Sequence, residues 1–169
     1  MKVSQQGNTV ILEDIKHFNP KHIFECGQCF RWIKQEDDSY TGVAMGKVIN
    51  VKQDGNKIYL DNTTKEDFDN IWYDYFDLGR DYESMVNTLK VMDEYLEKAT
   101  EFGEGIRILK QDGWEMLISF IISANNRIPM IQRAINNLSK NFGTYIGEYK
   151  NQEYYAFPTP QQLNKATIE

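Results

Sequence analysis

Membrane-spanning and secretory segments are missing from this sequence. It contains no run of about 18 uncharged apolar residues, the length that a transmembrane helix needs. Residues 1–16 contain no apolar stretch followed by a small-residue cleavage site, so a signal peptide is not expected. We therefore expect a cytoplasmic globular protein that makes no contact with a membrane.

Cysteine is scarce as well, since the chain contains two in 169 residues. A chain of this length buries roughly 68–70% of its unfolded surface, enough for a hydrophobic core without covalent staples. Hydrophobic residues make up 41% and aromatic residues 13% of the composition, which argues against intrinsic disorder. The length predicts one ordinary domain or two small ones.

The sequence also has no excess of positive charge. Its 19 Lys and Arg residues face 25 Asp and Glu residues, which gives a net charge of −6. This balance weakens the case for strong non-specific nucleic-acid binding, because Lys and Arg contacts to phosphate supply most of that affinity. However, residues 1–104 carry 12 basic and 20 acidic side chains, whereas residues 105–169 carry 7 and 5. The second part therefore permits a nucleic-acid enzyme whose contacts are concentrated there.

The first half of the sequence predicts an antiparallel sheet followed by helices. Short runs rich in Val, Ile, Tyr, Phe and Trp predict four strands, at Phe30–Lys34, Tyr40–Met45, Lys47–Lys52 and Lys57–Asp61. Asp54-Gly55 between two of these runs is typical of a hairpin turn. From Thr64 the apolar spacing changes to a helical stripe that ends at Leu78-Gly79, and Asp81 opens a second helical stretch that breaks near Asp93.

The last third of the sequence predicts helices only. Trp114–Ile122 is an apolar run capped by Asp112, and a second stripe over Ile128–Phe142 ends at Gly143. Thr159-Pro160-Gln161-Gln162 is a capping box that starts another helix. Since seven residues follow it without a stop signal, we expect the chain to be the front portion of a longer protein. On these elements alone, the fold class is α+β.

Few residues in the sequence indicate a metal or redox site. Cys26 and Cys29 form a C-x-x-C pair near His17 and His22, a donor set that suits zinc. The spacing is tighter than in common zinc fingers, no helix is predicted to carry the histidines, and no βαβ unit supports a thioredoxin-like pair. Two reduced thiols near a strand start are therefore the preferred interpretation. Ser-His-Asp, phosphate-loop and HExxH patterns are absent.

Two further segments have both a nucleic-acid interpretation and a structural one. Arg31-Trp32 is either a stacking pair for bases or part of a strand with Phe30 and Trp32 on one face and Arg31 on the other. Asn125-Asn126-Arg127 places two amides and a guanidinium at a helix junction, where they would bind phosphate or base edges, or simply cap the helix. For Arg31-Trp32 the strand is the commoner arrangement, whereas for Asn125-Asn126-Arg127 the spacing does not decide between the alternatives.

Four segments in order resemble motifs of the 8-oxoguanine DNA glycosylase family, which belongs to the helix-hairpin-helix glycosylases. Residues 27–32 resemble its G-Q-S/C-F-R-W segment, and residues 105–112 resemble G-V/I/L-R-I/L-L-R/K-Q-D. Residues 119–126 resemble S-F-I-x-S-x-N-N, and Phe157-Pro158 resembles a later F-P-S/T. Each motif alone is weak, but their shared order and spacing are specific.

The resemblance implies a fold and an activity. The expected fold is an N-terminal antiparallel sheet with helices, similar to half of the TATA-binding protein, over residues 1–104. The first helices of an all-α glycosylase domain would follow over residues 105–169. The implied activity is excision of 8-oxoguanine from double-stranded DNA after base flipping, with strand nicking at the abasic site. A DNA repair enzyme of this kind needs no cofactor and no metal, and we expect a monomer in the cytoplasm, associated with the nucleoid if the source is bacterial.

The resemblance also implies roles for single residues. The N7–H of the lesion would donate to the backbone carbonyl of Gly27, where glycine permits close approach of the backbone. Asn125 would fill the space left by the flipped base, and Asn126 would shape the region around it. Phe30 and Trp32 would be sheet core that supports the Gly27 loop.

The sequence departs from the family pattern at two places. Animal-type members have an arginine five positions after the first asparagine, where this chain has Met130, which cannot donate a hydrogen bond. This difference predicts a weaker preference for cytosine opposite the lesion, and whether Arg127 substitutes is open. The second departure is that the nucleophilic lysine and the aspartate of the family are expected downstream of Glu169, so no residue here is assigned as catalytic. The alternatives are a non-catalytic DNA-lesion-binding module and a small zinc or redox protein.

Overall fold

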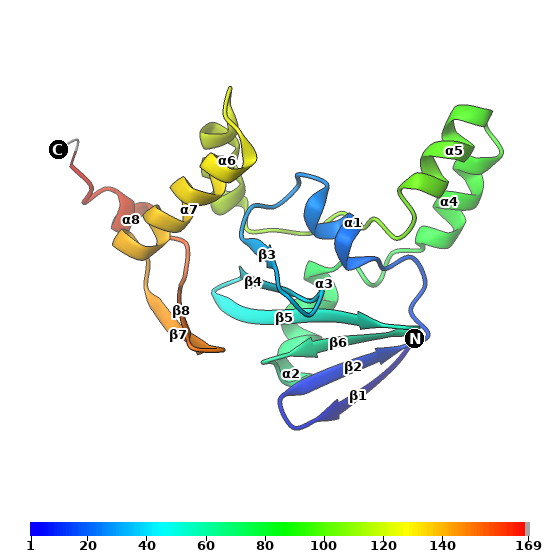
Figure 1. The fold of residues 1–169 in the computed structure, drawn as a ribbon, viewed down its shortest axis with the longest axis horizontal. Coiled ribbons are helices and arrows are strands. Elements are labelled where there is room, and N and C mark those ends of the chain that lie inside the picture. The colour runs from blue at the N-terminus through cyan, green and yellow to red at the C-terminus, as the bar shows by residue number, and fades with distance from the viewer. Residues whose placement is uncertain (168–169) are drawn as a thin grey trace.

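A six-stranded antiparallel sheet forms the centre of the computed structural model, which describes residues 1–167 (Figure 1). The strands are β1 (Lys2–Gln6), β2 (Thr9–Glu13), β3 (Trp32–Lys34), β4 (Tyr40–Ala44), β5 (Lys47–Asp54) and β6 (Lys57–Asp61). Their order is β1-β2-β6-β5-β4-β3, and every neighbouring pair is antiparallel. The predicted α+β class with an antiparallel sheet is therefore confirmed.

Strands β4, β5 and β6 match predicted strands, whereas the sheet has two more strands at one edge than were predicted. The hairpin at Asp54-Gly55 is confirmed, because Asp54 pairs with Lys57 and Gly55 has a φ of +59°. β1 and β2 were not predicted, although β2 contains the apolar run Thr9–Glu13. The predicted strand at Phe30 begins only at Trp32, because the two preceding residues belong to the loop that follows the first helix.

The helical segment after Thr64 packs into the same core as the sheet. The segment predicted as one helix from Thr64 is continuous over α2 (Lys65–Asp67), the π-helical turn η1 (Phe68–Trp72) and α3 (Tyr73–Tyr75). The Thr64 hydroxyl accepts the N–H of Asp67, as expected for a cap. The predicted stripe is buried at Phe68, Trp72 and Tyr75. The helix is therefore confirmed, with its end three residues before Leu78.

One short helix, α1 (Pro20–Glu25), was missed and corrects the expectation that no helix carries a histidine. Asn19 caps it and Pro20 occupies its first turn, a pair of signals that the sequence does contain. His22 lies on this helix, while Ile23 and Phe24 enter the same core as the sheet. The chain that leaves α1 leads directly into the resemblance motif at residues 27–32.

The predicted helical stretch after Asp81 is an antiparallel pair, α4 (Tyr82–Lys90) and α5 (Glu94–Phe102). The break falls at Asp93 as predicted, and the carboxylate of Asp93 caps α5. This pair extends away from the sheet (Figure 1). None of the helices in residues 1–167 combines the length and the apolar character needed to cross a bilayer.

The last third contains the predicted helices and one unexpected hairpin. The helices α6 (Gly113–Ser123) and α7 (Ile128–Phe142) lie where the apolar stripes place them, and α8 (Pro160–Leu163) begins with the predicted capping box. The expectation of helices only was wrong, because β7 (Tyr145–Tyr149) and β8 (Gln152–Tyr155) form a hairpin. Lys150 and Asn151 make its turn with φ values of +50° and +60°, a turn type that a search for Gly-containing pairs overlooks.

The core leaves no room for a side chain at Gly42. This glycine lies on β4 opposite Trp32 of β3, and a Cβ at this position would overlap the indole ring. The ring cannot easily shift, because it stacks on Phe24 at a centroid distance of 4.0 Å and its Nε1 donates to the Tyr75 hydroxyl at 3.0 Å. This contact fixes β3 and the loop before it against the core.

We expect Gly42→Ala to lower the free energy of unfolding by about 1–3 kcal/mol, the usual cost of overpacking a core. Gly113→Ala is the matched control, since Gly113 opens α6 with free space around it. This control should leave the stability unchanged or raise it by about 0.4–1 kcal/mol. Urea denaturation of both variants measures the difference, and equal midpoints would contradict the packing argument.

Candidate functional site

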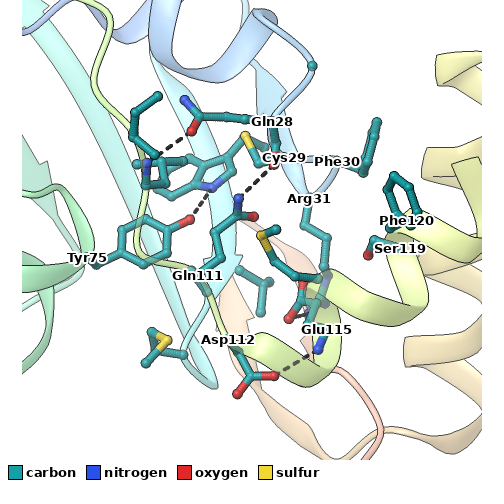
Figure 2. Close-up of a pocket in the computed structure, with 18 of the residues that line it drawn as sticks. Gln28, Cys29, Phe30, Arg31, Tyr75, Gln111, Asp112, Glu115, Ser119 and Phe120 are labelled. Atoms are coloured by element: carbon teal, nitrogen blue, oxygen red, sulfur yellow. Dashed lines mark hydrogen bonds and ion pairs between the residues drawn. The ribbon is translucent and has the colours of Figure 1, made fainter.

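A cleft of about 310 Å³ lies between the β3–β4 side of the sheet and helix α6. Its walls come from the loop after α1, the extended segment before α6, and α6 itself (Figure 2). The lining residues that carry the argument are Gly27, Gln28, Cys29, Phe30, Arg31, Gln111, Glu115, Ser119, Phe120 and Ser123. Three of the four resemblance motifs therefore contribute to a single cavity.

Gly27 forms an exposed edge of this cleft. Its φ of +86° lies in the left-handed region, so any side chain here would strain the backbone. An added Cβ would meet no atom within 4 Å, which shows that the backbone is openly accessible. Within residues 1–167 its carbonyl oxygen accepts no hydrogen bond. Gly27 therefore offers an unused backbone acceptor at the edge of the cleft.

The next residue, Gln28, attaches this loop to the extended segment that precedes α6. Its Nε2 donates to the carbonyls of Ile23 at 2.9 Å and Arg107 at 2.8 Å. Its Oε1 accepts the N–H of Leu109 at 3.0 Å, and its own carbonyl accepts Nε2 of Gln111 at 2.7 Å. Two segments some 80 residues apart in sequence are thus joined beside the cleft.

Arg107 fixes that extended segment from the opposite side. Its side chain is buried and donates to the carbonyls of Lys16, His17 and Asp77 over distances of 2.7–3.0 Å. Its guanidinium also lies 4.5 Å from the ring centroid of Tyr82. These four interactions hold a residue of the second motif against the sheet-bearing part of the chain.

Arg31 and Trp32 are both buried, so they are not a base-stacking pair. Trp32 belongs to the core as predicted, whereas Arg31 faces α6 and not solvent. Arg31 Nη1 lies 3.8 Å from Glu115 Oε2, and Nη2 donates to the carbonyl of Tyr155 on β8. Arg31 thereby connects the sheet, α6 and the β7–β8 hairpin.

Burial controls the electrostatics of this wall. It raises the pKa of Glu115 to about 6, and the nearby guanidinium of Arg31 only partly offsets the effect. The same burial lowers the pKa of Arg31. Glu115 is thus ionised at neutral pH but takes up a proton in mildly acidic solution.

The two cysteines and two histidines do not converge. Cys29 is buried and its thiol donates to the Phe24 carbonyl, and burial raises its pKa, which keeps the thiol protonated and unreactive. Cys26 is exposed, and His22 Nδ1 lies 2.7 Å from the carbonyl of Glu104. Among the residues that the structure describes, no group of three or more His, Cys, Asp or Glu side chains is arranged to hold a metal ion. The zinc alternative therefore has no geometric support.

Asn125, Asn126 and Arg127 lie at the exposed junction between α6 and α7. Ser123 at the end of α6 still lines the cleft, so the junction borders it. The capping interpretation was wrong, because Arg127 occupies the N-cap position of α7 and no side chain caps that helix. Asn126 instead accepts the N–H of Arg127 and donates to the Ile122 carbonyl at 3.2 Å. Asn125 has a φ of +52°, and Met130 is exposed one turn into α7.

Some residues of the cleft were not identified from the sequence or were placed wrongly. Phe30 was expected in the core, but it is half-buried on the cleft wall, because it precedes β3. Glu115, Ser119 and Ser123 also line the cleft. Their spacing of four residues within an otherwise apolar helix is a polar stripe, which was the available signal.

Comparison with known proteins gives consistent matches. An N-glycosylase/DNA lyase from Saccharomyces cerevisiae is 32% identical over 162 residues, which cover 88% of this chain and 43% of the yeast protein. The 8-oxoguanine glycosylase/lyase of Clostridium acetobutylicum, solved with double-stranded DNA containing cytosine opposite 8-oxoguanine, is 47% identical with a TM-score of 0.95. That match covers 99% of this chain and 57% of the clostridial chain.

A further solved structure, MBOgg1 in complex with a low-affinity DNA ligand, is 51% identical with a TM-score of 0.94, over 99% of this chain and 57% of its own. The chain thus spans less than half the length of the curated relatives it matches. The family model described as 8-oxoguanine DNA glycosylase, N-terminal domain, matches residues 10–117, which include strands β3 to β6 and most of β2, the Gly27 loop and the start of α6. The chain therefore belongs to the 8-oxoguanine DNA glycosylase family.

Proposed function

We propose that this chain is the N-terminal portion of a DNA repair enzyme that excises 8-oxoguanine from double-stranded DNA. The enzyme flips the damaged base out of the stack and cleaves it by lysine-mediated N-glycosylase and abasic-site lyase chemistry. The observation that carries the proposal is the shared cleft, because the free carbonyl of Gly27 and the end of α6 before Asn125 border the same cavity.

The Gly27 carbonyl is the group proposed to recognise the damaged base. Guanine presents N7 as a hydrogen-bond acceptor, whereas 8-oxoguanine carries a proton there and donates. A backbone carbonyl accepts a hydrogen bond but cannot donate one, so it favours the lesion and repels the N7 lone pair of guanine. The exposure of Gly27 and the absence of a side chain allow the base to approach this oxygen.

The α6–α7 junction is the proposed contact with the DNA that remains after flipping. Asn125 would occupy the space of the extruded base and contact the orphaned partner, and Asn126 would shape the surrounding region. Arg127 and Met130 would face the opposite strand. The exposure of all four side chains supports this role, because none of them is needed in the core.

The remaining parts of the proposal concern organisation. Residues 1–104 would form the N-terminal sheet domain, and residues 105–169 would begin the helical glycosylase domain that carries the lysine and aspartate outside this chain. We propose a monomer without cofactor or metal that works in the cytoplasm, associated with the nucleoid if the source is bacterial. The alternative, a non-catalytic lesion-binding module, uses the same cleft without the nucleophile.

We expect borohydride to trap a covalent adduct between an 8-oxoguanine duplex and the product of the uninterrupted reading frame, but not with residues 1–169 alone. Borohydride reduces a lysine–sugar imine to a stable amine, and within the described residues no lysine lines the cleft. Gel electrophoresis of the trapped complex is the measurement. An undamaged duplex is the control.

The outcomes separate the two candidates. An adduct with residues 1–169 would contradict the placement of the nucleophile outside this chain. No adduct with either protein, together with preferential binding of the damaged duplex, would favour the non-catalytic module.

We expect the active protein to show only a weak preference for cytosine over adenine opposite 8-oxoguanine, because Met130 cannot donate to a base. Met130→Arg should raise the preference for cytosine, since a well-placed polar contact to a base contributes about 1–3 kcal/mol of discrimination. Single-turnover excision from the two duplexes measures it. Asn137→Arg, on the same helix and exposed, controls for the added charge. Strong cytosine selectivity of the unmodified protein would contradict this prediction.

A further inference from the structure

The backbone around Gly27 lacks the hydrogen bonds that usually fix a carbonyl. Within residues 1–167, neither Gly27 nor Gln28 takes part in a backbone–backbone hydrogen bond. Glycine has the widest conformational freedom of any residue, and this one lies at the exposed rim of a cleft. A carbonyl that must meet a single donor atom therefore needs support from outside its own backbone.

The side chain of Gln28 supplies this support, since its amide is fully used. Nε2 donates to two carbonyl oxygens and Oε1 accepts one N–H, as described above. A glutamine amide has two N–H groups and one carbonyl, so each of its hydrogen-bonding groups has a partner. The main chain of Gln28 is held as well, because its carbonyl accepts Gln111 Nε2.

The groups that hold Gln28 are themselves buried or hydrogen-bonded. Ile23 is fully buried in the core, and Arg107 is buried by its three carbonyl contacts. The backbone beside Leu109 is fixed by the N–H of Lys110, which donates to the Tyr75 carbonyl at 2.9 Å. The position of the loop is thus set by the core of the sheet and by the segment that leads into α6.

We propose that Gln28 is a positioning residue for lesion discrimination, which orients the Gly27 carbonyl by clamping the loop to residues 107–111. This inference rests on the proposed function. The amide groups of Gln28 are engaged by the protein itself, so Gln28 acts through the neighbouring peptide. Glutamate, although of the same shape, cannot replace it, because a carboxylate would face the Ile23 and Arg107 carbonyls without a proton to donate.

The test uses whichever of the two proteins in the trapping experiment forms the adduct, with Gln28→Glu and Gln28→Met as variants. Fluorescence anisotropy measures Kd for duplexes with 8-oxoguanine or guanine at one position, each with a 2′-fluoro sugar that blocks cleavage. We expect both variants to lower the ratio of the two Kd values by about tenfold, in line with the loss of a net hydrogen bond or two. Affinity for the guanine duplex should stay unchanged, since phosphate contacts supply it.

The ratio distinguishes positioning from simple stability. A destabilised protein has a smaller active fraction and binds both duplexes less, which leaves the ratio constant. Gln53→Glu is the matched control, because Gln53 is an exposed hairpin residue outside the cleft, and it should keep the ratio of the unmodified protein. An unchanged ratio in both Gln28 variants would overturn the inference. If the unmodified protein neither excises 8-oxoguanine nor prefers the damaged duplex, the proposed function fails and this inference fails with it.

Discussion

The structure depends on how the chain satisfies the backbone of residues 105–111, which belong to no helix or strand. Buried peptide groups need partners, and this segment obtains them from elements earlier in the sequence. The carbonyl of Gly105 accepts the N–H of Asn19, the N–H of Ile108 donates to the Tyr82 hydroxyl, and the N–H of Leu109 donates to Gln28. The segment therefore has one defined path across the sheet-bearing part, and this path determines where α6 begins.

The cleft follows from that constraint. Because α6 starts at a fixed point, Glu115 comes to lie opposite Arg31, and the polar stripe of the helix lines a cavity. Removing two charges from water costs more than their attraction returns unless the geometry is good, and here Arg31 and Glu115 are 3.8 Å apart. The pKa of Glu115 is raised because its carboxylate has lost contact with water. The pair thus specifies how the sheet and helix face each other and adds little to stability.

The parts of the fold that were predictable from sequence are those governed by local periodicity. The stripes of α6 and α7, the caps at Asp112 and Thr159, and the hairpin at Asp54-Gly55 each repeat a short-range rule. The β7–β8 hairpin was missed because its turn uses Lys150-Asn151 in left-handed conformations. The burial of Arg31 was not predicted, because it depends on α6 and β8, more than 80 residues further along the chain. Local patterns contain no information about such contacts.

In the candidate site, too, the residues differ in whether local sequence or distant contacts determine their role. Gly27 was identified only through a family resemblance, since a glycine in a loop carries no chemistry by itself. Asn125 was already a candidate as one of two amides at a helix junction, and the resemblance added its specific role. Gln28 was part of the same motif, yet its role requires knowing that Ile23, Arg107 and Leu109 meet around its amide. A net charge of −6 also limits the attraction that this chain can exert on phosphate groups. Phosphate attraction does not distinguish one base from another, so the proposed selection of one oxidised purine would rest on neutral hydrogen bonds in fixed geometry. The unused carbonyl of Gly27, in a loop joined to residues 107–111 through Gln28, meets that requirement without adding a charge.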